Sequence, residues 1–281
     1  MTAALSQTPE ILLVGHISLD VTGEGSRVGG TVAYAGATLA VLGHKVGAVT
    51  STGPNLEWEP PRNLTLENIP AETSTSFENQ YMEGGRRQML HSRAVDLDID
   101  MVPTAWRSAP VVLLAPIADE IDPAIVKELP DSWIALTPQG WLRRWNAAGE
   151  VRRKEIESIS RLPRARMAFL SQEDLNGEDI WIERLADRYR WFILTEAEKG
   201  ARVYHQDTVT HFPAPQVDTL DPTGAGDIFA ACFISRYLET KDSGESARFA
   251  NQLAALSTTR VGMDSIPTAE EIENAREQAS L

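Results

Sequence analysis

The segment 221–227 reads Asp-Pro-Thr-Gly-Ala-Gly-Asp and leads into an apolar stretch typical of a buried helix. The start of a helix exposes unpaired backbone N–H groups and carries about half a positive charge, so it attracts anions. Because Gly224, Ala225 and Gly226 are small, a phosphate could approach these amides without obstruction. The spacing therefore predicts an anion hole at the beginning of this helix.

Asp227 follows directly and lies in the first turn of the same predicted helix. It could accept the proton of a substrate hydroxyl while the neighbouring amides stabilise a phosphoryl group during its transfer. The alternative is that Asp227 only caps the helix and that the glycines only form a turn. The rest of the sequence must decide between these interpretations.

Short apolar runs alternate with helix-like segments and predict an α/β fold, doubly wound, with a mainly parallel sheet flanked by helices. We expect one domain over residues 1–281. A helix is expected from about Val32 to Leu42. The predicted strands are residues 11–17, 45–50, 111–116, 133–138, 167–171 and 191–195.

Ligands of such sheets bind beyond the carboxyl ends of the strands. Four polar residues are expected at these ends, namely Asp20, Gln139, Ser171 and Thr195. Residues 73–97 read instead as a β-hairpin around Gly84-Gly85, outside the main sheet. Alternation along this hairpin would direct some side chains toward the site, with Asn79 and Arg87 as candidates.

Composition excludes several classes of function. The formal charge of −14 over 281 residues disfavours binding to nucleic acid or to an anionic membrane surface. The single cysteine, Cys232, rules out an internal disulfide, and no zinc-site spacing occurs. The first ten residues do not resemble a signal peptide, and no apolar run reaches the length of a membrane span. We therefore expect a cytoplasmic protein.

The 221–227 segment resembles the signature of the ribokinase-like (PfkB) carbohydrate kinases. Further segments resemble the same family in the expected order and cover nearly the whole chain: GHISLD at 15–20, the pair Gly29-Gly30, TEAEKGARVY at 195–204 and SARFANQLAALSTTRVG at 246–262. The resemblance implies a ribokinase-like fold with a small β lid. It favours the catalytic interpretation, with Asp227 as the base.

The resemblance also implies binding residues. Asp20, Gly29 and Gly30 would hold substrate hydroxyls, and a carboxylate is a strong acceptor for such groups. Tyr34 stands where many sugar kinases have asparagine, and Ala197 where the family often has glycine, which leaves the substrate open. The nucleotide would be bound by Thr195, Lys199, Gly200, Thr223 and Asn251.

The family's Asn-x-x-Glu motif, which organises Mg²⁺ through water, is replaced here by Ser171-Gln172-Glu173-Asp174. Asp174 and Ser171 are the matching candidates, and Glu173 competes with them. Many relatives also bind a monovalent cation beside the anion hole. The residues that match this K⁺ neighbourhood are Asp221, Thr223, Ser257, Arg260 and Gly262.

Only eight residues separate Asp20 from Gly29, so the lid should be shorter than in relatives, with the hairpin at 73–97 as most of it. This feature and the segment TPQGWLR at 137–143 resemble the inositol-kinase-like branch of the family.

The sequence thus predicts an ATP- and Mg²⁺-dependent kinase that transfers the γ-phosphate to a hydroxyl of a sugar or polyol, inositol-like compounds included. Tyr34, Asn79, Arg87 and Gln139 join the expected substrate site. A nucleoside kinase, with Tyr34 or Phe77 stacked on a base, is one alternative. A catalytically inactive sugar- or nucleotide-binding regulator is another. We expect a monomer or a homodimer.

Overall fold

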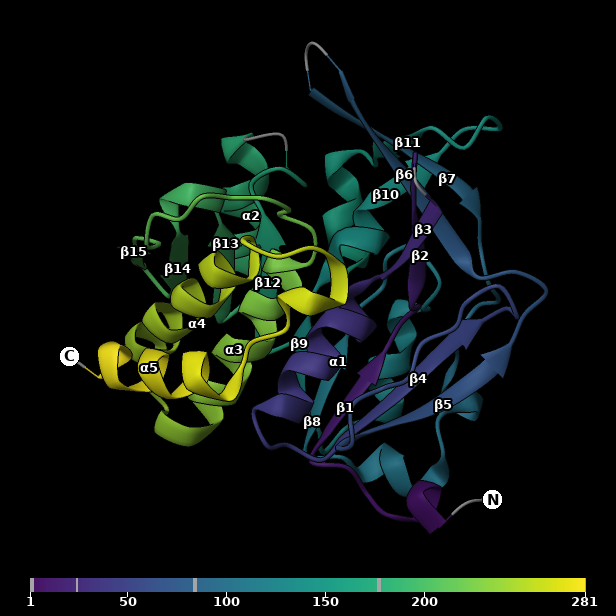
Figure 1. The fold of residues 1–281 in the computed structure, drawn as a ribbon, viewed down its shortest axis with the longest axis horizontal. Helices are drawn as coiled ribbons and strands as arrows, with labels where there is room; N and C mark the ends of the chain where they lie inside the picture. The colour runs from purple at the N-terminus through teal and green to yellow at the C-terminus, as the bar shows by residue number, and fades with distance from the viewer. Residues whose placement is uncertain (1–2, 24, 83–84, 176–177, 281) are drawn as a thin grey trace.

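The computed structural model describes residues 3–23, 25–82, 85–175 and 178–280. In this part of the chain, nine strands form one large sheet whose neighbours are parallel except at one edge, where β14 pairs antiparallel with β13 and β15 (Figure 1). In spatial order the strands are β15 (Thr208–Phe212), β14 (Ala201–His205), β13 (Trp191–Thr195), β12 (Met167–Ser171), β9 (Trp133–Leu136), β8 (Val111–Leu114), β1 (Ile11–Val14), β4 (Val46–Thr52) and β5 (Leu64–Pro70). The predicted fold class is confirmed.

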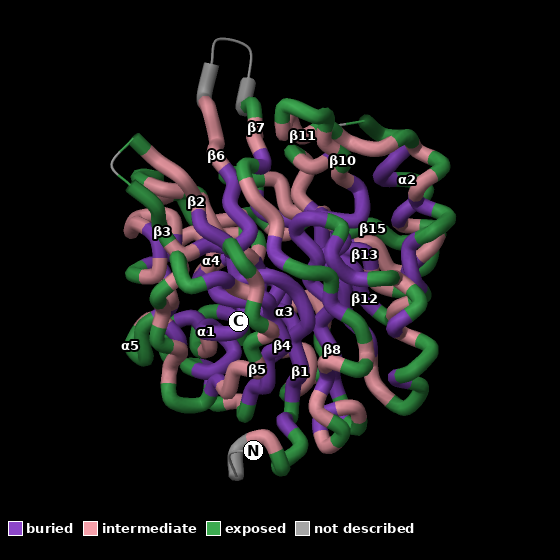
Figure 2. The backbone as a smooth tube through the Cα atoms, turned by 90° about the vertical axis from the view of Figure 1, so that its right-hand side faces the viewer, coloured by how far each residue is buried: buried purple, intermediate pink, exposed green. Residues whose placement is uncertain are grey.

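The central strand β1 explains why the sheet is covered on both faces. All four of its residues are fully buried. Because successive side chains point to opposite faces, both faces of the sheet must be covered here. Ile11 and Leu13 pack into one hydrophobic core, and Leu12 and Val14 into the other. Figure 2 shows this buried interior running through the middle of the molecule.

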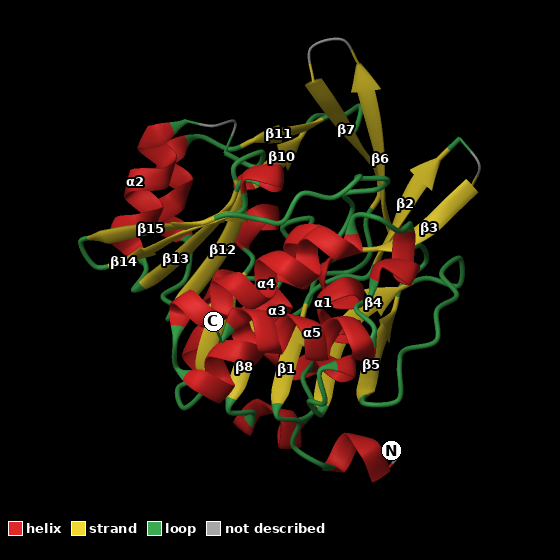
Figure 3. Cartoon of the chain, turned by 60° about the vertical axis from the view of Figure 1, so that its left-hand side comes forward, coloured by secondary structure: helices red, strands yellow, loops and turns green. Residues whose placement is uncertain are grey.

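Four helices cover one face of the sheet (Figure 3): α1 (Thr31–Val41), α3 (Ala225–Thr240), α4 (Ser243–Ser257) and α5 (Ala269–Ala279). The second core contains α2 (Asp179–Arg188). Several expected helical connections are short 3-10 turns instead, and a proline soon after most of these turns limits their length. The 3-10 turns are Ala3–Ser6, Ile99–Met101, Thr104–Ser108, Pro123–Glu128, Pro138–Leu142, Ile156–Arg161, Ala197–Lys199 and Gly262–Ser265.

A smaller sheet stands above the carboxyl ends of the main strands (Figures 1 and 3). Its order is β3 (Gly25–Gly29), β2 (Ser18–Thr22), β6 (Thr75–Met82) and β7 (Gly85–Ser92). The hairpin at 73–97 therefore supplies only half of it, because the short segment after Asp20 forms a second hairpin with Asp20 opposite Arg27. Asp20 lies inside β2 and not at the end of a strand over 11–17, since β1 ends at Val14.

The two sheets are joined where the chain crosses between them. The buried ring of His16 lies 2.8 Å from the carbonyl oxygen of Val95 and 2.7 Å from the hydroxyl of Thr75. Thr75 also accepts the backbone N–H of Ala94 at 3.0 Å, and the buried Glu120 accepts that of His16 at 3.0 Å. These bonds fix the small sheet above the main one. A further antiparallel pair, β10 (Arg143–Trp145) and β11 (Val151–Arg153), packs against β7.

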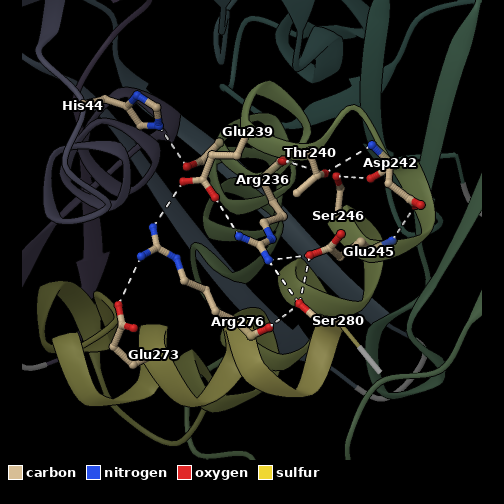
Figure 4. A network of polar contacts seen from close by, with 11 residues as sticks. His44, Arg236, Glu239, Thr240, Asp242, Glu245, Ser246, Glu273, Arg276 and Ser280 are labelled. Atoms are coloured by element: carbon tan, nitrogen blue, oxygen red, sulfur yellow. Dashed lines mark hydrogen bonds and ion pairs between the residues drawn. The ribbon is translucent and has the colours of Figure 1, made fainter.

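An ion-pair network fixes the direction of α3 (Figure 4). Arg236 donates to Glu239 at 2.7 Å and to Glu245 of α4, and Arg276 of α5 donates to Glu239 at 3.2 Å. The side chains of Arg236 and Glu245 are only 14% and 17% exposed. The network therefore holds α3, α4 and α5 together. It thereby fixes the orientation of α3, including that of its amino end. No helix in the described ranges has the length and apolar character needed to cross a bilayer.

We expect Arg236→Ala to lower the free energy of unfolding by about 2 kcal/mol, because Glu245 would stay partly buried without its cation. Urea unfolding followed by circular dichroism measures the change. Arg144→Ala is the matched control, since its pair with Glu155 is exposed on both sides and should contribute about 0.5 kcal/mol or less. Equal effects of the two substitutions would contradict the role of the network.

Candidate active site

A cavity of about 640 Å³ lies beyond the carboxyl ends of the main strands, bounded by the small sheet and by α3 and α4. The four residues expected at strand ends, Asp20, Gln139, Ser171 and Thr195, all line it. The amino ends of α1 and α3 contribute Gly30, Thr31, Tyr34 and residues 222–227. The structure thus brings together residues that are far apart in the chain; Asp20 and Asp227, for example, are 207 positions apart.

Gly224 begins α3 in a left-handed conformation, with φ at 80°. A Cβ atom at this position would lie 2.5 Å from the ring of Tyr34, so both the backbone angle and the packing require glycine. Gly226, by contrast, faces open space, with no atom within 4 Å of a Cβ added there. The amino end of α3 is therefore closed on the Tyr34 side and accessible from the cavity.

Asp227 lies in the first turn of α3, but it does not cap the helix. The cap position is Gly224, which offers no side chain, and the carboxylate is hydrogen-bonded to Thr31 at the start of α1. Asp227 is thus held at the cavity wall by a neighbouring helix. This geometry favours the catalytic interpretation over the capping one.

The surroundings of Asp227 raise its pKa from an ordinary 3.8 to about 7. Burial is the largest cause, because a low-dielectric environment disfavours the charged form. The bond from Thr31 and the charge of Arg143 oppose this shift in pKa, whereas Asp174 and Asp20 add to it. A carboxylate with this pKa is suited to accept and release a proton near neutral pH.

The candidate substrate residues of the first hairpin lie close together. Asp20 lines the cavity, and a Cβ at Gly29 would lie 2.4 Å from its carboxylate, so glycine leaves room for Asp20. Gly29 itself does not line the cavity, whereas Gly30, with φ at 88°, does. Burial and the nearby carboxylates, Asp20 first, raise the pKa of the Tyr34 phenol above its usual range.

The second hairpin corrects one prediction. Asn79 lies opposite Gln88, whose amide donates to Asn79 at 3.0 Å, and both residues line the cavity. Arg87 does not line it: its side chain is 45% exposed and lies 3.7 Å from Glu150. Neighbours on a strand point to opposite faces, so the strand register decides between them. Gln88 was missed because the register is not visible in the sequence.

A chain of polar contacts leads from Asp227 across the cavity wall. Thr31, which bonds Asp227, also accepts from the side-chain amide of Gln139 at 3.3 Å. Gln139 accepts from Arg143 at 2.7 Å, and Arg143 contacts Asp174 at 3.2 Å. Sequence reasoning missed Thr31 and Arg143. Arg143 ends the segment TPQGWLR, and the basic pair 143–144 reads from the sequence as a solvated surface more readily than as a rim that attracts phosphate.

Of the candidate nucleotide residues, Thr195, Gly200, Thr223 and Asn251 line the cavity. Asn251 donates to the carbonyl oxygens of Phe212 and Pro213, at 2.8 and 3.4 Å, and so holds the loop that forms part of this wall. Lys199 corrects a prediction: it ends an exposed 3-10 turn and does not line the cavity, because that turn directs it to solvent.

The residues expected at the Mg²⁺ site partly fit one. Asp174 uses one oxygen for Arg143 and the other for the backbone N–H of Ser171, at 3.3 Å, and exposed Glu173 lies beside it on the cavity wall. The described ranges contain no cluster of three or more His, Cys, Asp or Glu side chains arranged for a metal. Mg²⁺ needs only one or two carboxylates when phosphates and water complete its shell. Glu173, with Asp174 behind it, would therefore hold the metal on a bound polyphosphate.

The candidate K⁺ residues come from two adjacent segments, joined by the bond from the Asp221 N–H to the Thr258 carbonyl at 2.9 Å. Asp221 accepts the N–H of Thr223 at 3.0 Å. The guanidinium of Arg260 is paired with Glu271 at 2.6 Å, and its backbone N–H donates to Ser257. Gly262 has φ at 57°. Of the expected K⁺ residues only Thr223 lines the cavity. A cation bound by these residues would therefore lie beside the cavity and not inside it.

The fold defines the class of protein. It superposes on a pyrophosphate-dependent kinase of the ribokinase family, solved with a pyrophosphate analogue and myo-inositol, with a TM-score of 0.77, 17% identity and coverage of 94% of this chain and 99% of the other. It also superposes on the ribokinase of Thermotoga maritima, with a TM-score of 0.68, 21% identity and coverage of 95% and 99%. The chain has the ribokinase-like fold.

A family model matches most of the second half of the chain. Residues 166–269 match the model of the pfkB family carbohydrate kinases, which confirms the resemblance over the segment that contains Asp227 and the start of α3. This part of the chain is similar to the pfkB family.

Two relatives show how far the similarity extends. Fructokinase-2 of Oryza sativa is 32% identical over 110 residues, which is 36% of this chain and 33% of that protein. The chain thus matches only about a third of the length of this relative. The cytidine kinase of Thermococcus kodakarensis is 24% identical over 276 residues, which cover 85% of this chain and 92% of that protein.

We expect Gly226→Ala to separate stability from ligand binding. An added methyl group meets open space, and alanine favours a helix by up to about 1 kcal/mol, so the melting temperature should stay the same or rise. The same methyl group would stand between a phosphate and the amides, so affinity for a phosphate-bearing ligand should fall at least about tenfold. Thermal unfolding and calorimetric titration with ATP measure the two effects.

Gly224→Ala is the comparison for this pair, because the left-handed backbone and the Tyr34 ring both oppose a side chain there. It should lower the melting temperature as well as the affinity. A Gly226→Ala variant that binds ATP as tightly as the original protein would place the phosphate elsewhere.

Proposed function

We propose that this protein is an ATP-dependent kinase that phosphorylates a hydroxyl group of a sugar or polyol. The observation that carries the proposal is the position of Asp227. A carboxylate with a pKa of about 7 stands at the wall of the large cavity, in the first turn of a helix whose amino end is accessible from that cavity. The family match of residues 166–269 supports the same reaction class.

The reaction follows from this arrangement. Asp227 accepts the proton of the acceptor hydroxyl as the hydroxyl oxygen forms a bond to the γ-phosphorus of ATP. The bond from that phosphorus to the bridging β,γ-oxygen breaks, and ADP carries away the electron pair. The amides at residues 224–226 face the negative charge of the transferred group. Mg²⁺ on the phosphates, beside Glu173, would supply neutralising charge.

The acceptor is placed at the small sheet, where Asp20, Asn79 and Gln88 present polar groups to the cavity. Hydroxyl-rich compounds suit such a wall, because each hydroxyl can both donate and accept. Tyr34 and Phe77 both line the cavity, but they are only 1% and 4% exposed, and Tyr34 lies against Gly224, so little of either ring is available for stacking. This favours a sugar or polyol over a base stacked on either ring. The small sheet acts as the lid.

The donor is placed at the other end, between the loop 214–219 and α4. Small and mainly apolar residues form this wall, namely Ala214, Pro215, Val217, Ala254 and Ala255. A flat heterocycle such as adenine fits against small apolar side chains. Since structural neighbours include kinases described as pyrophosphate-dependent, ATP and pyrophosphate should be compared as donors. K⁺ bound beside residues 221–223 is proposed as an activator.

A nucleoside kinase is the second candidate, because one relative, matched over 85% of this chain, is a cytidine kinase. Incubation with Mg²⁺ and either donor, with sugars, inositols and nucleosides as acceptors, separates the two by the mass of the product. A phosphorylated sugar or polyol supports the proposal, and a phosphorylated nucleoside supports the second candidate. The absence of any phosphorylated product would favour a binding regulator.

We expect Asp227→Asn to lower kcat by a factor of about 10² to 10⁴, because the amide cannot accept the proton of the hydroxyl. Calorimetric affinity for ATP and the unfolding midpoint should change little. Steady-state kinetics on the best acceptor give the measurement. Turnover within about twofold of the original protein would remove Asp227 from the base role.

The pH dependence has a predictable sign. Asp227 must be ionised to act, and its pKa is about 7, so kcat/KM should rise about tenfold per unit below pH 7 and level off above it. Initial rates from about pH 5.5 to about pH 8.5, with stability checked at each end, provide the profile. A flat profile would show that no group with this pKa controls the reaction.

A further inference from the structure

The cavity has an uneven distribution of charge. Five carboxylates line it in the described ranges, Asp20, Glu173, Asp174, Glu198 and Asp227, against one basic side chain, Arg143. A polyphosphate brought into such walls is repelled unless cations face it directly. The amino end of α3 offers only about half a charge. Arg143 is therefore the one full protein charge in these walls that can attract the donor.

Arg143 is held in place for such a contact. Its side chain is 14% exposed and is fixed by Gln139 at 2.7 Å, Asp174 at 3.2 Å and the carbonyl oxygen of Ile117 at 3.4 Å. Through Gln139 and Thr31 it is connected to Asp227. A guanidinium held by its own partners is a fixed cation whose remaining N–H groups, on Nε and Nη1, can donate to phosphate oxygens.

We propose that Arg143 binds the transferred phosphoryl group, opposite the amino end of α3, and that Gln139 and Asp174 position it. This inference rests on the proposed function. In it, Arg143 is a catalytic residue, because it touches the group that moves and neutralises the charge on its oxygens. Asp174 serves mainly as the anchor of Arg143, and Glu173 is the carboxylate closer to the metal.

The decisive experiment compares two ligands that differ in the γ-phosphate. Calorimetric titrations with ADP and with the non-hydrolysable analogue AMP-PNP are made on the original protein, Arg143→Ala and Arg143→Lys. We expect Arg143→Ala to weaken AMP-PNP binding about tenfold to a hundredfold and ADP binding less than about threefold. Arg143→Lys keeps the charge but loses the planar group that Gln139 and Asp174 hold, so its affinity for AMP-PNP should lie between that of the original protein and that of Arg143→Ala.

Arg144→Ala is the matched control, because that neighbour pairs with Glu155 at the surface and does not line the cavity. In turnover assays Arg143→Ala should lower kcat at least about a hundredfold, and Arg144→Ala should not change it. Equal losses for ADP and AMP-PNP, or no loss for either, would overturn the role of Arg143 while leaving the kinase proposal intact. If the original protein showed no turnover but Arg143→Ala still lost AMP-PNP binding selectively, the kinase proposal would fail and the role of Arg143 in phosphate binding would stand.

Asp174→Asn tests the anchoring role separately. If Asp174 positions Arg143, the variant should lose affinity for AMP-PNP in the same selective way, while the Mg²⁺ concentration that gives half-maximal rate stays within about twofold. If Asp174 is a metal ligand instead, that Mg²⁺ concentration should rise at least about tenfold. The second outcome would contradict the anchoring role.

Discussion

The proposed reaction brings a polyanion into a cavity lined by carboxylates, and this electrostatic constraint governs the site. In the proposed reaction the acidic groups are needed for chemistry, since Asp227 would take a proton and Asp20 would hold hydroxyls. They also raise the cost of binding phosphate. The molecule answers with localised positive potential, from backbone amides at 224–226 and from Arg143, within a chain whose formal charge is −14. The positive groups that can neutralise phosphate charge are thus confined to the place where a phosphoryl group would lie.

That localisation depends on elements far from the cavity. The amino end of α3 is aimed by the network of Arg236, Glu239 and Glu245 at its other end, and by its packing against α1 and α4. The small sheet is held over the cavity by bonds at the crossing points, around His16 and Thr75. Charge placement in the site is therefore a property of the whole helical layer and of both sheets.

The features that could be predicted from the sequence are those determined by residues close together in the chain. The apolar runs indicated the main strands, and the small residues before Asp227 indicated the start of α3, because each signal lies within a few adjacent positions. The role of Arg87 was wrongly assigned, and Gln88 was missed, because strand register depends on pairing with β6. Arg143 was missed for a similar reason: its partners Gln139 and Asp174 meet it only in the folded chain.

The contact of the Tyr34 ring with Gly224 has an evolutionary consequence. One face of this ring shapes the beginning of α3, while the residue as a whole borders the space assigned to the acceptor. A substitution at position 34 that altered acceptor preference would also loosen the support of the amides proposed to bind phosphate. Selection for a new substrate is thereby steered toward Asn79 and Gln88, whose side chains can change without disturbing the helix.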